Sequence, residues 1–220
     1  MSWILNIDTA LNTASVCLSE NGIPSFYSEN KIQKDHSGWL HKAIQSVTAL
    51  AGIDIKQLTA VAVNIGPGSY TGLRVGLSAG KGLCYALNIP LISINSLELA
   101  AFAVQNDATD IICSAIDARR MEIYSSTYDN KLNIIDNPSA MVVDQQTFTN
   151  LLDKHKVLFC GNGSHKLKDI ICHTNAMFSE IESSAKQMAE ISYLRFTKNI
   201  FSHLATTDPL YLKDSYTAPI

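Results

Sequence analysis

Charged residues are scarce in this chain of 220 residues, at 17% of the total. Globular domains carry about 25% on average, so the shortage indicates an extensive buried or contact surface. The formal net charge is −3. Because nucleic-acid-binding domains present a broad basic face, we expect no large direct footprint on RNA. The hydrophobic share of 46% is enough for one large domain or two small ones.

The five cysteines include no C-x-x-C pair, and most lie in apolar runs. This pattern indicates buried free thiols in a reducing compartment. The N-terminus has no basic segment, and Asp8 interrupts its short apolar run, so we expect no signal peptide. The longest charge-free stretches contain Gly-Pro-Gly or Asn-Ile-Pro and cannot be membrane spans. We therefore expect a soluble, cytoplasmic protein.

The familiar catalytic motifs are missing. No lysine follows Gly72 as in a Walker loop, and the neighbouring glycines do not fit G-x-G-x-x-G. No H-E-x-x-H occurs, and His36 and His41 lie about 140° apart around a helix, so no metal site is expected. Ser69 is not in a G-x-S-x-G context; with Thr71 it is better explained as a helix cap.

One stretch with many glycines stands out, from Gly66 to Gly80. It follows the apolar run 60–65, which predicts a buried strand, and it leads into a helix that runs to about residue 87. Gly72, Gly76 and Gly80 are four residues apart and share one helix face. Each costs roughly 1 kcal/mol against alanine, so another backbone must approach closely. That neighbour is either a helix of this chain or a second subunit.

The order of predicted elements repeats. The first half has strands at 3–8, 14–19 and 23–29, a helix at 37–51, the glycine stretch, a strand at 91–94 and a helix at 97–104. After a polar linker at 106–110, the second half has strands at 111–117, 121–128 and 132–135, a helix at 145–155, a strand at 157–160, a glycine turn, and helices at 165–171 and 185–203. Ser37, Ser96 and Asp144 are the expected helix caps.

Such a repeat indicates a duplicated domain. We predict an α/β chain of two lobes, 1–106 and 107–220, in the actin-like ATPase (ASKHA, RNase H-like) class. The last helix and an extended tail from residue 209 are expected to pack back on the first lobe. In this architecture two facing lobes enclose a cleft into which turn carboxylates and glycine turns point.

Several motifs together resemble the TsaB (YeaZ) family, and the resemblance spans nearly the whole chain. They are Ile7-Asp8-Thr9-Ala10, His36-Ser37, the block from Gly66 to Arg74 (GPGSYTGLR), the block from Ala115 to Tyr124 (AIDARRMEIY) and Pro209-Leu210-Tyr211-Leu212. The family usually has glycine where this chain has Met121, which puts the geometry of the local hairpin in question.

The resemblance implies a non-catalytic subunit for the synthesis of threonylcarbamoyladenosine in tRNA. It implies binding and activation of the paralogous transferase TsaD, recruitment of the ATPase TsaE, a homodimer when alone, and contact with tRNA only through the complex. Together with the glycine face it predicts a partner interface on the first-lobe helices. The residues of this interface are Leu40, Ile44, Val47, Tyr70, Gly72, Arg74, Gly76 and Gly80.

The rival prediction is a small-molecule phosphotransferase or ATPase of the actin-like class. Turn aspartates and glycine turns hold Mg-ATP in that class, and this chain has analogous residues: Asp8, Gly66, Gly68, Asp117, Gly161 and Gly163. The glycine turns have no lysine nearby. We therefore expect a vestigial nucleotide cleft with at most weak binding of ATP or ADP, no cofactor and no catalytic residue, and the aspartates in structural roles.

Overall fold

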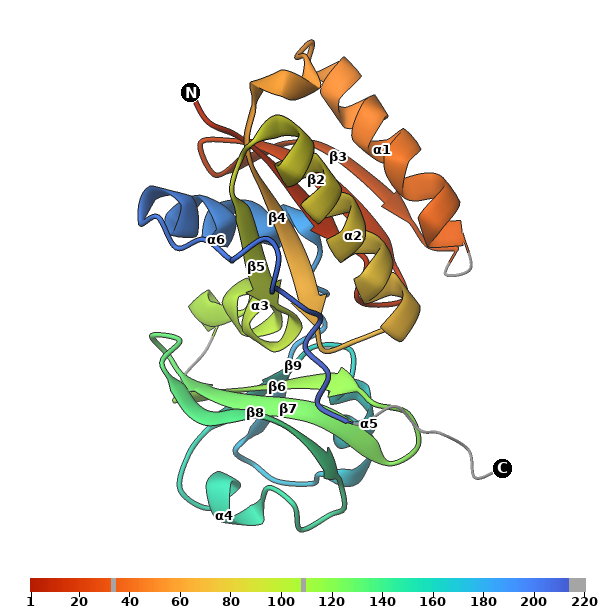
Figure 1. The fold of residues 1–220 in the computed structure, drawn as a ribbon. Coiled ribbons are helices and arrows are strands. Elements are labelled where there is room, and N and C mark those ends of the chain that lie inside the picture. The colour runs from red at the N-terminus through yellow and green to blue at the C-terminus, as the bar shows by residue number, and fades with distance from the viewer. Residues whose placement is uncertain (33–34, 108–109, 214–220) are drawn as a thin grey trace, which may run out of the picture.

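The computed structural model describes residues 1–32, 35–107 and 110–213. It contains two five-stranded mixed sheets, stacked one above the other in Figure 1. The first half contributes β1 (Trp3–Asp8), β2 (Ala14–Glu20), β3 (Ile23–Asn30), α1 (His36–Leu50), β4 (Leu58–Gly66), α2 (Tyr70–Leu87), β5 (Leu91–Asn95) and α3 (Ser96–Ala103), with short 3-10 turns at Ile55–Gln57 and Gln105–Asp107.

The second half contributes β6 (Ile111–Asp117), β7 (Glu122–Asp129), β8 (Ile134–Val142), α4 (Thr149–Leu152), β9 (Val157–Cys160), α5 (Ser164–Ile170), β10 (Ala176–Phe178) and α6 (Ala185–Thr197). The strand orders are β3-β2-β1-β4-β5 and β8-β7-β6-β9-β10, which are the same topology twice. In each sheet the first three strands are antiparallel, and the last two run parallel to the first. The predicted duplication and the two-lobed fold class are confirmed.

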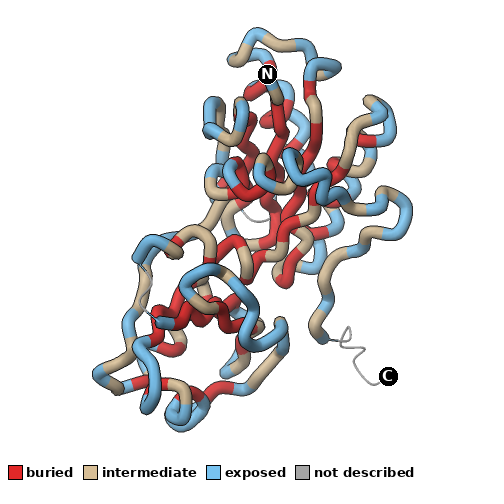
Figure 2. Tube along the Cα trace, turned by 90° about the vertical axis from the view of Figure 1, so that its left-hand side faces the viewer, coloured by how far each residue is buried: buried red, intermediate tan, exposed pale blue. Residues whose placement is uncertain are grey.

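Helices cover both faces of the first sheet. On one face, Leu40, Ile44 and Val47 of α1 pack with Leu77 of α2 against β1 and β4. On the other face, α6 packs its Met188 against residues of β1, β4 and β5. Although α6 follows the second sheet in the chain, it belongs to the core of the first. Figure 2 shows the buried residues concentrated along the two sheets.

α3 connects the two lobes through packing. Its residues are apolar almost all round, which is typical of a fully buried helix. Leu99 lies in the core under the first sheet, whereas Ala100 and Ala101 pack with Ile112 of β6 in the second. The boundary near residue 106 stays a prediction. Among the described residues, no helix is both long and apolar enough to cross a membrane.

Several predicted boundaries were wrong. α1 begins at His36 and not after Ser37, and Asn95 instead of Ser96 caps α3. The helix expected at 145–155 shortens to α4, because Asp144 hydrogen-bonds Thr147 in a separate turn. The strand expected at 132–135 is β8, which pairs with β7 from Ile134 to Val142, and β10 was not predicted. The last helix ends at Thr197, because Asn199 adopts a left-handed conformation.

A buried polar contact ties α6 to the first sheet. The Ser192 hydroxyl donates to Asn6 Oδ1 at 2.7 Å, and the Asn6 amide donates to the Cys17 carbonyl and the Ser19 hydroxyl. Ser192→Ala leaves a buried acceptor unsatisfied, so we expect it to lower the free energy of unfolding by about 1–2 kcal/mol in urea titrations. Ser46→Ala, an exposed change on α1, is the control. Equal stability of both variants would show that this contact contributes nothing.

Candidate binding cleft and the predicted partner face

A cleft of about 530 Å³ lies where the two lobes meet. The first lobe lines it with the turn after β1, residues 10–12, and with the start of α2, residues 68–71. The second lobe lines it with residues 117–119, Tyr124 and Asn162. Tyr211 and Lys213 of the C-terminal segment complete the wall. The cleft is large enough for a small-molecule ligand.

The Asp8 carboxylate does not line this cleft. It is 2% exposed and lies behind the turn, where its Oδ1 accepts hydrogen bonds from the Ala10 amide and the Asn64 side chain, both at 3.0 Å. Loss of hydration raises the pKa of Asp8 to about 6, and the two hydrogen bonds offset only part of that effect. Asp8 therefore serves the structure of the turn, and it is covered from any ligand in the cleft.

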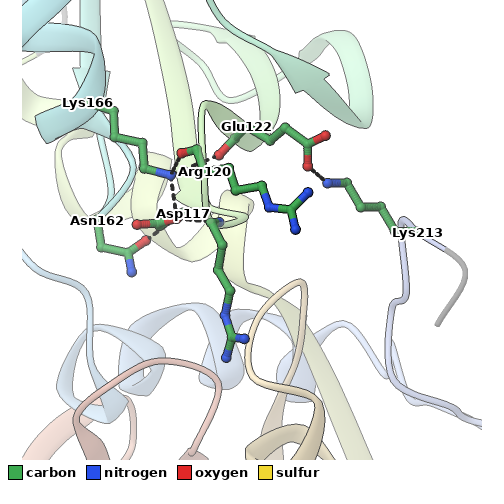
Figure 3. Close-up of polar contacts among 7 residues, drawn as sticks. Asp117, Arg120, Glu122, Asn162, Lys166 and Lys213 are labelled. Atoms are coloured by element: carbon green, nitrogen blue, oxygen red, sulfur yellow. Dashed lines mark hydrogen bonds and ion pairs between the residues drawn. The ribbon is translucent and has the colours of Figure 1, made fainter. Parts of the chain in front are cut away.

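Asp117 lies at the cleft, but its charge is already paired (Figure 3). Its Oδ1 accepts the Lys166 ammonium at 2.6 Å and the Arg119 amide at 2.5 Å. Lys166 also donates to the backbone carbonyls of Arg120 at 2.6 Å and Glu122 at 3.2 Å. The expectation that the glycine turns have no lysine nearby was wrong, because Lys166 follows Gly163 by only three residues. Its position in the first turn of the helix that follows the second glycine turn could have identified it as a residue of the cleft region.

The turn between β6 and β7 has two left-handed residues in succession, Arg119 with φ 66° and Arg120 with φ 51°. The left-handed region costs a non-glycine residue roughly 1–2 kcal/mol. The Lys166 contacts and a hydrogen bond from the Glu122 amide to the Arg119 carbonyl at 3.2 Å hold the turn in place. The hairpin therefore forms with Met121 at the position where the family usually has glycine.

The C-terminal segment runs as a strap from the first lobe to the second, in dark blue in Figure 1. The Leu210 amide donates to the Ile65 carbonyl at 2.7 Å. The Tyr211 hydroxyl accepts from Arg74 Nε at 2.9 Å, and the Tyr211 ring packs on Tyr70 with centroids 5.3 Å apart. On the second lobe, Lys213 forms an ion pair with Glu122 (Figure 3).

The glycine face of α2 packs on the chain's own first sheet. A Cβ at Gly72 would lie 2.0 Å from the Thr9 carbonyl oxygen; at Gly76, 2.3 Å from Thr9 Oγ1; and at Gly80, 2.4 Å from a Val63 methyl. These contacts require glycine at each position. The close neighbour is therefore the β1–β4 region, and neither a second helix nor a second subunit.

Six of the eight residues predicted for the partner interface are buried within this chain, so this part of the prediction is wrong. Leu40, Ile44 and Val47 are core residues, no more than 3% exposed, and the three glycines of α2 are buried as well. The sequence pattern of an apolar helix stripe is the same whether the stripe packs on the chain's own sheet or on a partner protein. Of the predicted set, only Tyr70 and Arg74 are exposed.

The two glycine turns have matching structural roles. A Cβ at Gly68 would lie 2.2 Å from the Ala10 carbonyl oxygen, and one at Gly161 would lie 2.5 Å from that of Ala115. In the first lobe the Ser69 amide donates to Ala10, and in the second the Gly163 amide donates to Ala115. The first turn thus packs against the turn that follows β1, and the second packs against β6. Ser69 also caps the start of α2, as predicted, because its hydroxyl accepts a hydrogen bond from the Gly72 amide.

Gly66 has a left-handed φ of 105°, which favours glycine at this position. Its backbone lies against Leu73 and against the strap at Leu210. Of the predicted nucleotide residues, only Gly68 and Asp117 line the cleft. Within the described ranges, no group of three His, Cys, Asp or Glu side chains could hold a metal ion.

Two lobes of identical topology that enclose a cleft define the actin-like ATPase fold. Comparison with known proteins identifies a family within this class. The family described as "TsaD: tRNA N6-adenosine threonylcarbamoyltransferase" matches residues 29–218. The TsaB protein of Bacillus subtilis is 31% identical over 172 residues, which cover 76% of this chain and 74% of that protein. The chain belongs to the TsaB (YeaZ) family within this group.

Other relatives agree in sequence and in fold. The TsaB protein of Escherichia coli is 32% identical over 132 residues, covering 59% of this chain and 56% of that protein. In the first two curated relatives the match spans about half of their length. The solved structure of YeaZ from Pseudomonas aeruginosa superposes with a TM-score of 0.83 at 21% identity, covering 96% of this chain and all of that one.

Proposed function

We propose that this chain is a non-catalytic accessory subunit in the synthesis of N6-threonylcarbamoyladenosine in tRNA, and that it acts in the cytoplasm. In this role it binds and activates a TsaD-type transferase and helps to recruit a TsaE-type ATPase. Contact with tRNA is made through the complex. Family membership supports the pathway, since the relatives are named as tRNA threonylcarbamoyladenosine biosynthesis proteins.

The single observation that supports an accessory role is the state of the two turn aspartates. A phosphotransferase of this fold class needs carboxylates that are free to hold a metal–nucleotide complex. Here Asp117 is ion-paired with Lys166, and Asp8 is buried and hydrogen-bonded. The rival assignment as a phosphotransferase or ATPase therefore has less support.

The partner surface that fits this role is the outer face of α2. Arg74, Ser78, Lys81 and Tyr85 follow one another at helical spacing and form a stripe on the side opposite the glycines. Tyr85 is 83% exposed, and Tyr70 at the start of the helix is 49% exposed. Tyrosine and arginine are enriched at the energetic centres of interfaces. We expect self-association of the free chain to use the same stripe.

Size exclusion with light scattering, on the chain mixed with its cognate TsaD, tests this proposal. We expect a one-to-one complex whose dissociation constant rises at least about tenfold in Tyr85→Ala and in Lys81→Glu. Lys131→Glu, the same charge reversal on an exposed lysine of the second lobe, is the matched control and should change affinity less than about twofold. Wild-type chain that forms no complex contradicts the proposed role. A complex that both variants leave intact contradicts the stripe only.

A further inference from the structure

The strap, residues 209–213, contacts both lobes within a very short length of chain. Tyr211 is hydrogen-bonded to the first lobe, and Lys213 is paired with Glu122 at the start of β7 in the second (Figure 3). These two strap residues are two positions apart, a span of at most about 7 Å even in a fully extended chain. Tyr211 therefore cannot move far from its place without pulling Lys213 away from Glu122.

The first-lobe end of the strap is held by contacts of several kinds. The Leu210 amide donates to the Ile65 carbonyl at 2.7 Å, and the Tyr211 hydroxyl accepts from Arg74 Nε at 2.9 Å. The Arg74 guanidinium also lies over the Tyr70 ring, 3.9 Å from its centroid, and the Tyr70 ring packs against Tyr211. These contacts combine hydrogen bonds, ring packing and a cation–π interaction, and they hold Tyr211 at the first turn of α2.

The second-lobe end of the strap is more exposed. The side chains of Lys213 and Glu122 are 35% and 33% exposed, and ion pairs with this exposure are weak and screened by salt. Glu122 also closes the β6–β7 turn, because its amide donates to the Arg119 carbonyl and its carbonyl accepts from the Ala118 amide. The attachment of the strap to this turn is therefore one that opens and closes easily.

We propose that the strap couples the start of α2 to the β6–β7 turn, so that loss of the Tyr211 contact makes the turn in the other lobe open more often. The coupling acts in both directions, because a coupling free energy between two sites is reciprocal. Tyr70 and Arg74, which hold Tyr211, belong to the partner surface proposed above. A partner that takes Arg74 from Tyr211 would thus release the turn that carries Asp117. This consequence rests on the proposed function, whereas the coupling is a property of the free chain.

Hydrogen exchange of the free full-length chain, followed at single amides by NMR, tests the coupling. In Tyr211→Ala we expect the Ala118 and Glu122 amides of the turn to exchange at least about threefold faster, as for loss of a weak exposed contact. Phe201→Ala is the matched control. It removes an aromatic ring of similar exposure, 41% against 42%, which packs on Phe196. It should change the two rates by less than about 1.5-fold.

The reverse direction is tested with charge. Lys213→Glu places two carboxylates together, so the Leu210 amide on the first lobe should exchange at least about threefold faster. The double variant Lys213→Glu, Glu122→Lys restores an ion pair of reversed polarity and should return this rate to within about 1.5-fold of wild type. Lys168→Glu breaks an exposed ion pair with Glu180 inside the second lobe, and as the control it should leave the Leu210 rate unchanged.

Three results would overturn the coupling. The first is unchanged exchange of the turn in Tyr211→Ala. The second is equal acceleration in Phe201→Ala, which would indicate a general loss of stability. The third is a double charge variant in which the Leu210 amide exchanges as fast as in Lys213→Glu. Because every measurement uses the chain without partners, these results are independent of whether it binds TsaD.

Discussion

Gly72→Ala is expected to lower the free energy of unfolding by about 3 kcal/mol or more. The new Cβ would lie 2.0 Å from the Thr9 carbonyl oxygen, which is backbone and cannot move aside as a flexible side chain would. The same contact region includes a hydrogen bond from the Thr9 hydroxyl to the Gly72 carbonyl at 2.7 Å. Overpacking a tight core typically costs 1–3 kcal/mol, occasionally more. Urea titration of the purified variant measures this loss.

Gly82→Ala is the matched control, in the same helix but with no neighbour within 4 Å of the added Cβ. It should raise stability by up to about 1 kcal/mol, because alanine is the better helix former. If Gly72→Ala were as stable as Gly82→Ala while partner binding was lost, the glycine face would be an interface after all. Gly76→Leu cannot serve as an interface test, because it would disrupt the core at Thr9.

Asp8→Asn is expected to become more stable relative to wild type as pH rises. Burial raises the pKa of Asp8 from 3.8 to about 6, so the folded state binds the proton more tightly than the unfolded state. The stability from this protonation is fully present below about pH 4 and is lost as pH rises through 6. The change in the free-energy difference between the two proteins, from about pH 4 to about pH 8, should be on the order of 2 kcal/mol.

Urea titrations of both proteins across this range provide the measurement, and the difference cancels the other titrating groups. Asp129→Asn is the control whose difference from wild type should stay nearly flat between about pH 4 and about pH 8. A hydrogen bond from the Asn133 side chain lowers the pKa of Asp129 from its ordinary value of 3.8, so its ionised form stabilises the folded state and that stability is lost only as pH falls below this range. A flat difference for Asp8→Asn would mean that this carboxylate is hydrated in the folded state.

The order of helices and strands could be predicted from the sequence because most of these elements have a clear local sequence pattern. The apolar run of β4, the Asn21-Gly22 turn and the polar linker near residue 107 marked the repeated halves. Short or weakly patterned elements could not be read. β10 has only three residues, and α4 is a remnant of a longer helical pattern. Their existence depends on tertiary contacts, such as the pairing of β10 with β9.

The candidate site was predicted less well. The spacing of Gly72, Gly76 and Gly80 does predict close approach, but it does not say which backbone approaches. That identity depends on a contact with Thr9, more than 60 positions away in the chain. Lys166 was missed for the same reason, because its pairing with Asp117 joins residues 49 positions apart. Tyr85 lies in no recognisable motif, and only its exposure suggests it as a residue of the proposed partner surface.

The measurement that tests the account most directly is threonylcarbamoyl transfer to tRNA by the cognate transferase and ATPase, with and without this chain. The account predicts that product forms at a useful rate only when the chain is present, and that the chain alone hydrolyses no ATP. Transfer that proceeds equally well without the chain would contradict the account. ATP hydrolysis or phosphorylation of a small molecule by the chain alone would also contradict it, and would restore Asp8 and Asp117 as catalytic candidates.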